Sequence, residues 1–178
     1  MLTRRSTGPG TVGFVSFRGP GNVRGTMGKQ SGLENTLVGV AGEYFVAAEL
    51  TIRGYLASIT LRNSRGIDII ASSSDAKRSV SIQVKTSSGN VPKWMLTQKS
   101  ASFSADNHFY VFVLLRDVGV RPDFHIVSSQ VVAEYVATSH RQWLAGTKAD
   151  GSSRKDSAMR NFHDPDQQYK EAWDLLNL

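Results

Sequence analysis

Three polar residues in the first half of the chain have the types and the spacing that metal-assisted phosphate chemistry requires. Gln83 and Lys85 alternate with apolar residues over 80–86, so they share one face of a predicted strand. Asp68 lies in an earlier short apolar run, which we expect to form the neighbouring strand. A carboxylate, an amide oxygen and an ammonium would then converge. Oxygen ligands with open water positions suit Mg²⁺, and an ammonium suits an anionic phosphate.

A fourth candidate residue lies on a predicted helix. The segment 37–53 is apolar almost all round, which indicates a helix buried against a sheet, and Gly54 is its expected C′ residue. Glu43 is the exception, because it is in register with Val46 and Leu50 on an apolar face. Its carboxylate could approach the other three groups from above the sheet.

Other segments give the elements that must position these residues. A capping-box pattern at 31–34 precedes the first helix, and Ser128 or Ser129 could cap a second helix over 131–138, with an extension to 144. We predict strands over six ranges: 55–61, 67–71, 80–86, 94–96, 109–115 and 124–127. Residues 145–161 have the composition of a loop, and 169–176 should form a short terminal helix. This order indicates an α/β or α+β fold with helices covering a sheet.

Composition bounds the class of protein. A chain of 178 residues is long enough for one domain with a real core. The absence of cysteine excludes a disulfide framework, a thiolate metal site and a cysteine nucleophile. No apolar stretch approaches the ~20 residues that span a bilayer, and no apolar segment follows the N-terminal arginines. We therefore expect a cytoplasmic protein without membrane association.

The positive charge is concentrated at the N-terminus. The net charge is +6, but residues 1–26 hold four of the 21 basic residues and none of the 15 acidic ones, which leaves +2 for the rest. We expect residues 1–30 to be a flexible basic leader and residues 31–178 to be a single domain. The leader could be a basic arm on DNA, a tail without a role, or a segment upstream of a translation start at Met27.

Three motifs together resemble a known superfamily. They are G-E-x-x-V-A-A-x-L at 42–50, G-I-D-I-I at 66–70 and I-Q-V-K-T at 82–86. In this set the chain resembles the PD-(D/E)XK nucleases, and in pattern the Holliday-junction-resolvase-like and Mrr-type members above all. The resemblance covers about residues 35–115. It implies a restriction-endonuclease-like mixed central β-sheet flanked by α-helices, and Mg²⁺-dependent endonuclease action on DNA, with Mn²⁺ as a substitute.

The resemblance also implies roles for individual residues. Asp68 would be the principal metal ligand, and Gln83 would occupy the position of the second acidic ligand. Lys85 would be the catalytic lysine, which orients the attacking water or stabilises the phosphorane. Glu43 matches the helix glutamate that many members add to the metal shell. The backbone carbonyl of Val84 would complete the set of ligands.

One departure from the superfamily pattern keeps other functions open. Most members have an acid where this chain has Gln83, although Mrr-type members also have glutamine. A neutral amide weakens metal binding, so the alternative is an inactive nuclease fold that binds DNA or serves in an assembly. A third hypothesis is an interaction protein with exposed apolar strands.

Each residue also has an ordinary structural interpretation. Glu43 could pair with Arg53 or Arg62, and Asp68 could accept backbone hydrogen bonds after its turn. Gln83 and Lys85 could be the solvated face of an edge strand.

Basic residues near the motifs are candidates for DNA contact. They are Arg62, Arg65, Lys93 and Lys99, with solvated surface as the alternative. A homodimer would suit cleavage of both strands of a symmetric target. The four histidines show no metal-ligand spacing, and nothing in the sequence calls for a small-molecule cofactor.

Overall fold

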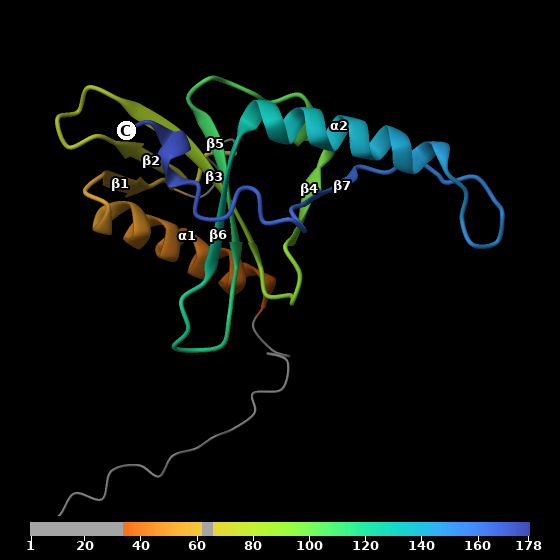
Figure 1. Ribbon diagram of the computed structural model, residues 1–178, viewed down its shortest axis with the longest axis horizontal. Coiled ribbons are helices and arrows are strands. Elements are labelled where there is room, and N and C mark those ends of the chain that lie inside the picture. The colour runs from red at the N-terminus through yellow and green to blue at the C-terminus, as the bar shows by residue number, and fades with distance from the viewer. Residues whose placement is uncertain (1–33, 62–65) are drawn as a thin grey trace, which may run out of the picture.

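The computed structural model of the chain describes residues 34–61 and 66–178 (Figure 1). The predicted leader, Arg62 and Arg65 lie outside the described residues. The elements follow in this order: α1 (Asn35–Ile52), β1 (Leu56–Ile59), β2 (Ile69–Ser72), β3 (Ser79–Ser87), β4 (Lys93–Thr97), η1 (Gln98–Ala101), β5 (His108–Leu114), β6 (Asp123–Ser128), α2 (Ser129–Ala145), β7 (Met159–His163) and η2 (Trp173–Leu176). Neither described α-helix is long and apolar enough to cross a bilayer.

A five-stranded mixed sheet forms the centre of the fold. Its strand order is β1-β2-β3-β5-β6, in which β3 and β5 are parallel and the other neighbours are antiparallel. All seven residues of β5 are buried, as the continuous apolar run at 109–115 predicted. The expected mixed α+β architecture is confirmed, and β1, β2 and β3 form an antiparallel meander at one side of the sheet.

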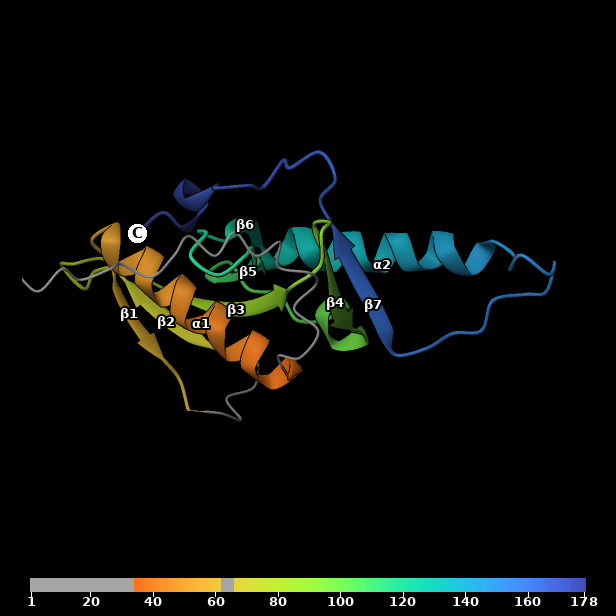
Figure 2. The same cartoon turned by 90° about the horizontal axis from the view of Figure 1, so that it is seen from below.

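The two faces of the sheet pack against different partners. One face is covered by α1 and by the C-terminal segment with η2, and its core contains Val46, Leu50, Ile82, Val111 and Trp173. The other face is covered by α2 and by a two-stranded ribbon of β4 and β7. Figure 2 shows α1 in front of β3, with the ribbon and α2 at the other end of the molecule.

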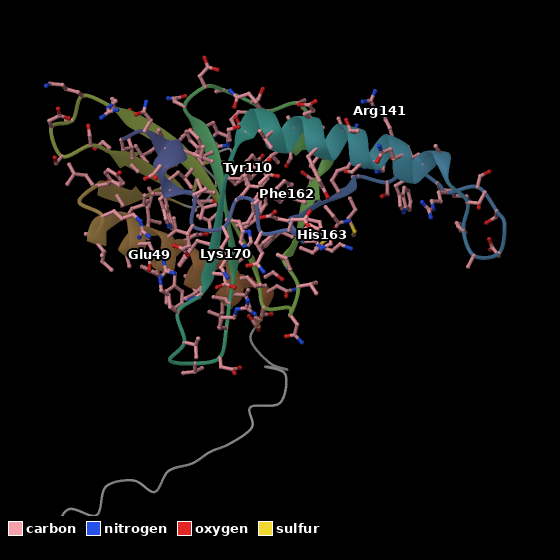
Figure 3. All side chains as sticks on the ribbon, in the orientation of Figure 1. Glu49, Tyr110, Arg141, Phe162, His163 and Lys170 are labelled. Carbon is pink, nitrogen blue, oxygen red and sulfur yellow. The ribbon has the colours of Figure 1, made fainter. Side chains whose placement is uncertain are left out.

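The second core is aromatic. Trp94 of β4 and Phe162 of β7 pack against Phe112 of β5, and the Phe112 and Phe162 rings are stacked with centroids 4.5 Å apart. The Trp94 Nε1 donates a hydrogen bond of 2.8 Å to the Val113 carbonyl, which satisfies its polar atom inside the core. Figure 3 places Phe162 and Tyr110 between the sheet and α2. These contacts fix the ribbon rigidly to the sheet.

Helix α1 follows its prediction in length and in its packing against the sheet. It is bounded by Glu34 and Arg53, and Gly54 takes the left-handed conformation expected of a C′ residue (φ +87°). Its buried line is Val38, Gly42, Val46 and Leu50. This line packs against the sheet as predicted, and the solvent side carries four large apolar residues: Leu37, Tyr44, Phe45 and Ile52.

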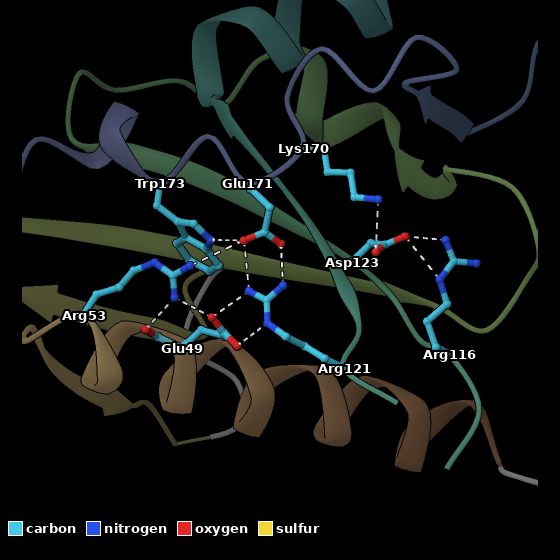
Figure 4. Close-up of polar contacts among 8 residues, drawn as sticks. All are labelled: Glu49, Arg53, Arg116, Arg121, Asp123, Lys170, Glu171 and Trp173. Carbon is cyan, nitrogen blue, oxygen red and sulfur yellow. Dashed lines mark hydrogen bonds and ion pairs between the residues drawn. The ribbon is translucent and has the colours of Figure 1, made fainter. Parts of the chain in front are cut away.

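A charged cluster fastens α1 to the chain's end (Figure 4). Arg121 donates hydrogen bonds of 2.8 Å to the carboxylates of Glu49 and Glu171. Arg53 pairs with Glu49 and stands over the Trp173 ring. The hydrogen bonds from Arg121 are the main cause that lowers the pKa of Glu49 from 4.5 to about 2.

The second half of the chain holds the largest differences from the prediction. Helix α2 begins as expected, with the Ser128 hydroxyl accepting a hydrogen bond from the Val131 N–H. The loop predicted at 145–161 contains the start of β7, which the prediction missed. The terminal helix is reduced to a single 3₁₀ turn, although Trp173 and Leu176 are buried as expected.

Candidate functional site

Asp68 is held between two strands at the entrance to β2. Its carbonyl accepts from the Thr60 N–H, and its own N–H donates to the Ile82 carbonyl, both at 2.9 Å. Since Ile69 is paired with Ile82, Asp68 stands opposite Gln83 on β3. One oxygen of its carboxylate, Oδ2, accepts a hydrogen bond of 2.7 Å from the Val84 N–H. The backbone thus fixes the direction of a carboxylate beside the middle of β3.

Gln83 and Lys85 share the face of β3 that points toward the ribbon and α2. Both are half-buried, and β3 lies between β2 and β5, so the interpretation of a solvated edge strand was wrong. Gly66 has a left-handed backbone (φ +71°), and a Cβ there would lie 3.6 Å from the Gln83 amide nitrogen. The turn that leads to Asp68 therefore passes directly beside the Gln83 side chain.

Lys85 opens onto a hollow beside the ribbon. The hollow has a volume of about 380 Å³ and is lined by Lys85 together with Met95, Leu96, Thr97, Ala158 and Met159. Within the part of the chain that the structure describes, no carboxylate forms an ion pair with Lys85. Its ammonium is therefore available to an anion that enters from this side.

The Val84 carbonyl is directed toward the same place as Asp68. In an extended strand the N–H and the C=O of one residue point to the same side. Since the Val84 N–H reaches Asp68, the Val84 carbonyl also points toward β2. The structure thus brings together three kinds of oxygen: a carboxylate, an amide and a backbone carbonyl.

Glu43 lies on α1, which covers the other face of the sheet. The helix backbone touches the end of β3, because a Cβ on Gly42 would lie 1.9 Å from the Thr86 hydroxyl oxygen. Glu43 and Glu49 are about 120° apart around the helix, on either side of its buried line. Since Glu49 meets Arg121 at the β6 side, Glu43 faces the opposite side, where β1 and β2 lie.

The described residues do not form an acidic metal cluster. Over 34–61 and 66–178, no group of three or more His, Cys, Asp or Glu side chains is arranged to hold a metal ion. Asp68 therefore stands with neutral oxygen donors rather than with a second and third carboxylate. Among the basic candidates, Lys93 is exposed on the ribbon and Lys99 is exposed in η1.

Two buried residues beside the site were not singled out from the sequence. The parallel pairing sets His108 opposite Ser81 and Tyr110 opposite Gln83. Burial lowers the pKa of His108, and burial raises the pKa of Tyr110, while the charge of Asp68 raises the pKa of both. The His108 Nδ1 lies 2.9 Å from the Ser81 hydroxyl. Only the β3–β5 register could have indicated these neighbours, and no local sequence pattern encodes it.

Taken together, the fold and the site define a mixed α+β protein with a carboxylate, an amide and a lysine at the middle of its sheet. No protein-family model and no curated protein matches the sequence. Among solved structures, the chain is similar to a bacterial homing endonuclease, with a TM-score of 0.49 and 13% sequence identity. The alignment covers 81% of this chain and 92% of that chain.

Proposed function

We propose that this protein is a metal-dependent endonuclease that hydrolyses phosphodiester bonds in DNA. The supporting observation is the geometry at β2 and β3. There the Asp68 carboxylate is fixed by the Val84 N–H, opposite Gln83 and on the same strand face as Lys85, which has no ion-pair partner among residues 34–61 and 66–178. A pre-positioned carboxylate next to a lysine is an arrangement that suits an anionic substrate, because neither group must reorganise when charge develops.

The donor set fits a hard divalent cation such as Mg²⁺, or Mn²⁺ in its place. Asp68, the Gln83 amide oxygen and the Val84 carbonyl would hold the ion. When bound, the ion would activate water and neutralise charge on the phosphate. The Lys85 ammonium would contact the phosphate from the ribbon side and hold the attacking water in line.

The cleavage experiment uses supercoiled plasmid and a four-way branched DNA, with Mg²⁺ or Mn²⁺. Asp68→Asn keeps an acceptor for the Val84 N–H and removes the charge, so cleavage should fall at least about a hundredfold while the thermal melt stays within a few degrees. Lys85→Ala should have a similar effect. Lys77→Ala, an exposed lysine in the β2–β3 turn, is the matched control and should cut normally. Normal cutting by Asp68→Asn would show that the site is misassigned.

A second candidate function is a DNA-binding or assembly protein with the same fold and no catalysis. The neutral side chain at Gln83 and the lack of an acidic cluster among the described residues favour it. Calorimetry separates the two hypotheses, because a site without catalysis has no need to bind Mn²⁺. A well-folded protein that binds duplex DNA but neither binds Mn²⁺ nor cuts either substrate would establish this second function.

A further inference from the structure

The β4–β7 ribbon has two chemically different faces. Directly opposed residues of an antiparallel pair share a face. The pairs Trp94–Phe162 and Leu96–Arg160 point into the second core and are buried. The remaining pairs form what we call the outward face: Lys93–His163, Met95–Asn161 and Thr97–Met159. Met95 and Met159 are 63% and 56% exposed, so this face has no packing role within the described chain.

The outward face connects two hollows. The first is the hollow of Lys85, which Met95, Thr97 and Met159 also line. The second has a volume of about 350 Å³ and is lined by Lys93, Met159, Asn161 and His163 together with residues of α2, among them His140 and Trp143. Met159 belongs to both. A single surface therefore runs from Lys85, across the ribbon, to the second half of α2.

This surface suits a polyanion. Among the residues that the structure describes, no aspartate or glutamate lines either hollow, whereas Lys85, Lys93 and Arg160 do. Asp156 stands at the rim, where it pairs with His140 and Arg160. Trp143 is stacked against His140 and also lies under Arg154, so its ring faces are occupied and it offers no platform for a base. The surface thus offers the ammonium groups of Lys85 and Lys93 toward its ends. The Asn161 amide and the thioethers of Met95 and Met159 lie between them.

The dimensions and the chemistry point to a nucleic acid groove. The major groove of B-form DNA, ~12 Å wide, admits a two-stranded ribbon whose strands lie ~4.8 Å apart. Lysines then meet phosphates, an asparagine can pair with an adenine edge, and apolar groups can contact thymine methyls. We propose that the outward face of the β4–β7 ribbon enters the major groove of duplex DNA and sets the register of a phosphate at Lys85. This proposal rests on the proposed function, because it names that site's substrate as a duplex.

The test uses the natural absence of cysteine from the chain. Met95→Cys gives the full-length protein a single thiol on the outward face. It is incubated, in EDTA and with a redox buffer, with duplexes that carry a tethered thiol either on cytosine N4 in the major groove or on guanine N2 in the minor groove. We expect at least tenfold more protein–DNA disulfide with the major-groove duplex. Ser74→Cys, an exposed residue in the β2–β3 turn, is the matched control and should give little with either duplex.

Several results would overturn the proposal. They are preference for the minor-groove duplex, equal yields from Met95→Cys and Ser74→Cys, no duplex binding at all, and disulfide-linked protein dimers in place of protein–DNA products. The last result would show that a second copy covers the ribbon. Because EDTA prevents cleavage, the cross-link is independent of catalysis. If the protein forms the major-groove cross-link but never cleaves DNA, the proposal for the ribbon is supported and the proposed nuclease function is contradicted.

Charge variants provide a second measurement. The Met95→Glu/Met159→Glu double variant places two carboxylates on the outward face, where the core is not disturbed. Its affinity for a 30-base-pair duplex should fall at least tenfold in fluorescence anisotropy. Lys93→Ala should reduce the slope of log K against log salt by about one, as expected for one lost phosphate contact, and Lys77→Ala should leave it unchanged. An unchanged affinity in the double variant would contradict the proposal.

Discussion

At the scale of single residues, the charge at position 83 governs how strongly the site can hold a cation. The Asp68 carboxylate lies directly beside β3, where its Oδ2 accepts a hydrogen bond from the Val84 N–H. The Gln83 amide contributes an oxygen without a formal charge. A divalent ion there would be held by less negative charge than in a site with two or three carboxylates, so we expect weak binding that responds strongly to added charge.

Gln83→Glu tests this directly. The added carboxylate should tighten Mn²⁺ binding at least about tenfold in isothermal titration calorimetry, because it adds a charged oxygen at contact distance from the ion. Without metal the same variant should melt at a lower temperature than the wild type, since two carboxylates would then face each other. Gln142→Glu, on the exposed side of α2, is the control and should leave both quantities unchanged. Equal Mn²⁺ affinity in Gln83→Glu and the wild type would place the metal elsewhere.

The grouping of Asp68, Gln83 and Lys85 could be predicted from the sequence, because the alternation of polar and apolar residues over 80–86 is a local pattern. The spacing of Gln83 and Lys85 requires a common face, and the turn before Asp68 requires a neighbouring strand. The ordinary interpretation of Asp68 as an acceptor of backbone hydrogen bonds is also confirmed by the Val84 contact. His108 could not be predicted, because its place beside Ser81 depends on a parallel pairing across 26 residues of intervening chain.

At the scale of elements, the placement of α1 depends on a glycine, because Gly42 has no side chain to separate the helix from β3. Gly42 lets the helix backbone touch Thr86 at the end of β3, and the Thr86 hydroxyl is buried without a hydrogen-bond partner among the described residues. Any side chain at position 42 must push the helix away from the strand that holds Gln83 and Lys85.

Gly42→Ala should therefore destabilise the protein, whereas Gly39→Ala should not. A Cβ at position 42 would overlap Thr86, at a cost of about 2–3 kcal/mol of unfolding free energy. A Cβ at position 39 would meet nothing within 4 Å, so the better helix propensity of alanine should stabilise that variant by up to ~1 kcal/mol. Urea denaturation of the two variants measures both changes. A Gly42→Ala protein as stable as Gly39→Ala would show that α1 does not approach β3 closely.

The prediction missed β7, a short strand that is buried on one side only and carries polar residues. The seven buried residues of β5 gave a clear apolar run, but β7 has only five residues and presents Arg160 to the inside. The Arg160 guanidinium is accommodated there because it donates to the Met159 carbonyl at 2.9 Å and also to the Ser157 carbonyl. The sequence of β7 shows no alternation of apolar residues that would predict a strand. The strand forms because Phe162 packs into the aromatic core.

At the scale of the whole molecule, the N-terminal helix and the C-terminal segment are joined by charge as well as by packing. Glu49 on α1 and Glu171 near the end share Arg121, which lies between β5 and β6. Three segments distant in sequence thus close around the first core. Because the folded-state pKa of Glu49 is about 2, below its ordinary value of 4.5, this contribution to stability is complete above about pH 4.5 and is lost as the pH falls toward 2.

Arg121→Ala should reveal that pH dependence. Near pH 6 the variant should be less stable than the wild type by about 1–2 kcal/mol, allowing for solvent screening of the partly exposed pair. The difference should narrow as the pH is lowered from 4.5 to 3, because the unfolded chain then binds a proton at Glu49 that the folded wild type, with its lowered pKa, does not bind. Arg141→Ala, on the exposed side of α2, should show a small difference that does not change with pH. Chemical denaturation at several pH values measures the curves, and a constant gap for Arg121→Ala would contradict the assignment.

Inward and outward side chains alternate along the β4–β7 ribbon. Mutations that change stability and mutations that change recognition therefore fall at different positions. Trp94, Leu96 and Phe162 are committed to the core, whereas Lys93, Met95 and Asn161 make no packing contribution to it. Mutations at the outward positions are therefore nearly neutral for folding and open to selection on whatever the ribbon meets. A lineage could retarget such a protein one outward side chain at a time without passing through an unfolded ancestor. A library randomised at those positions should consist mostly of folded proteins.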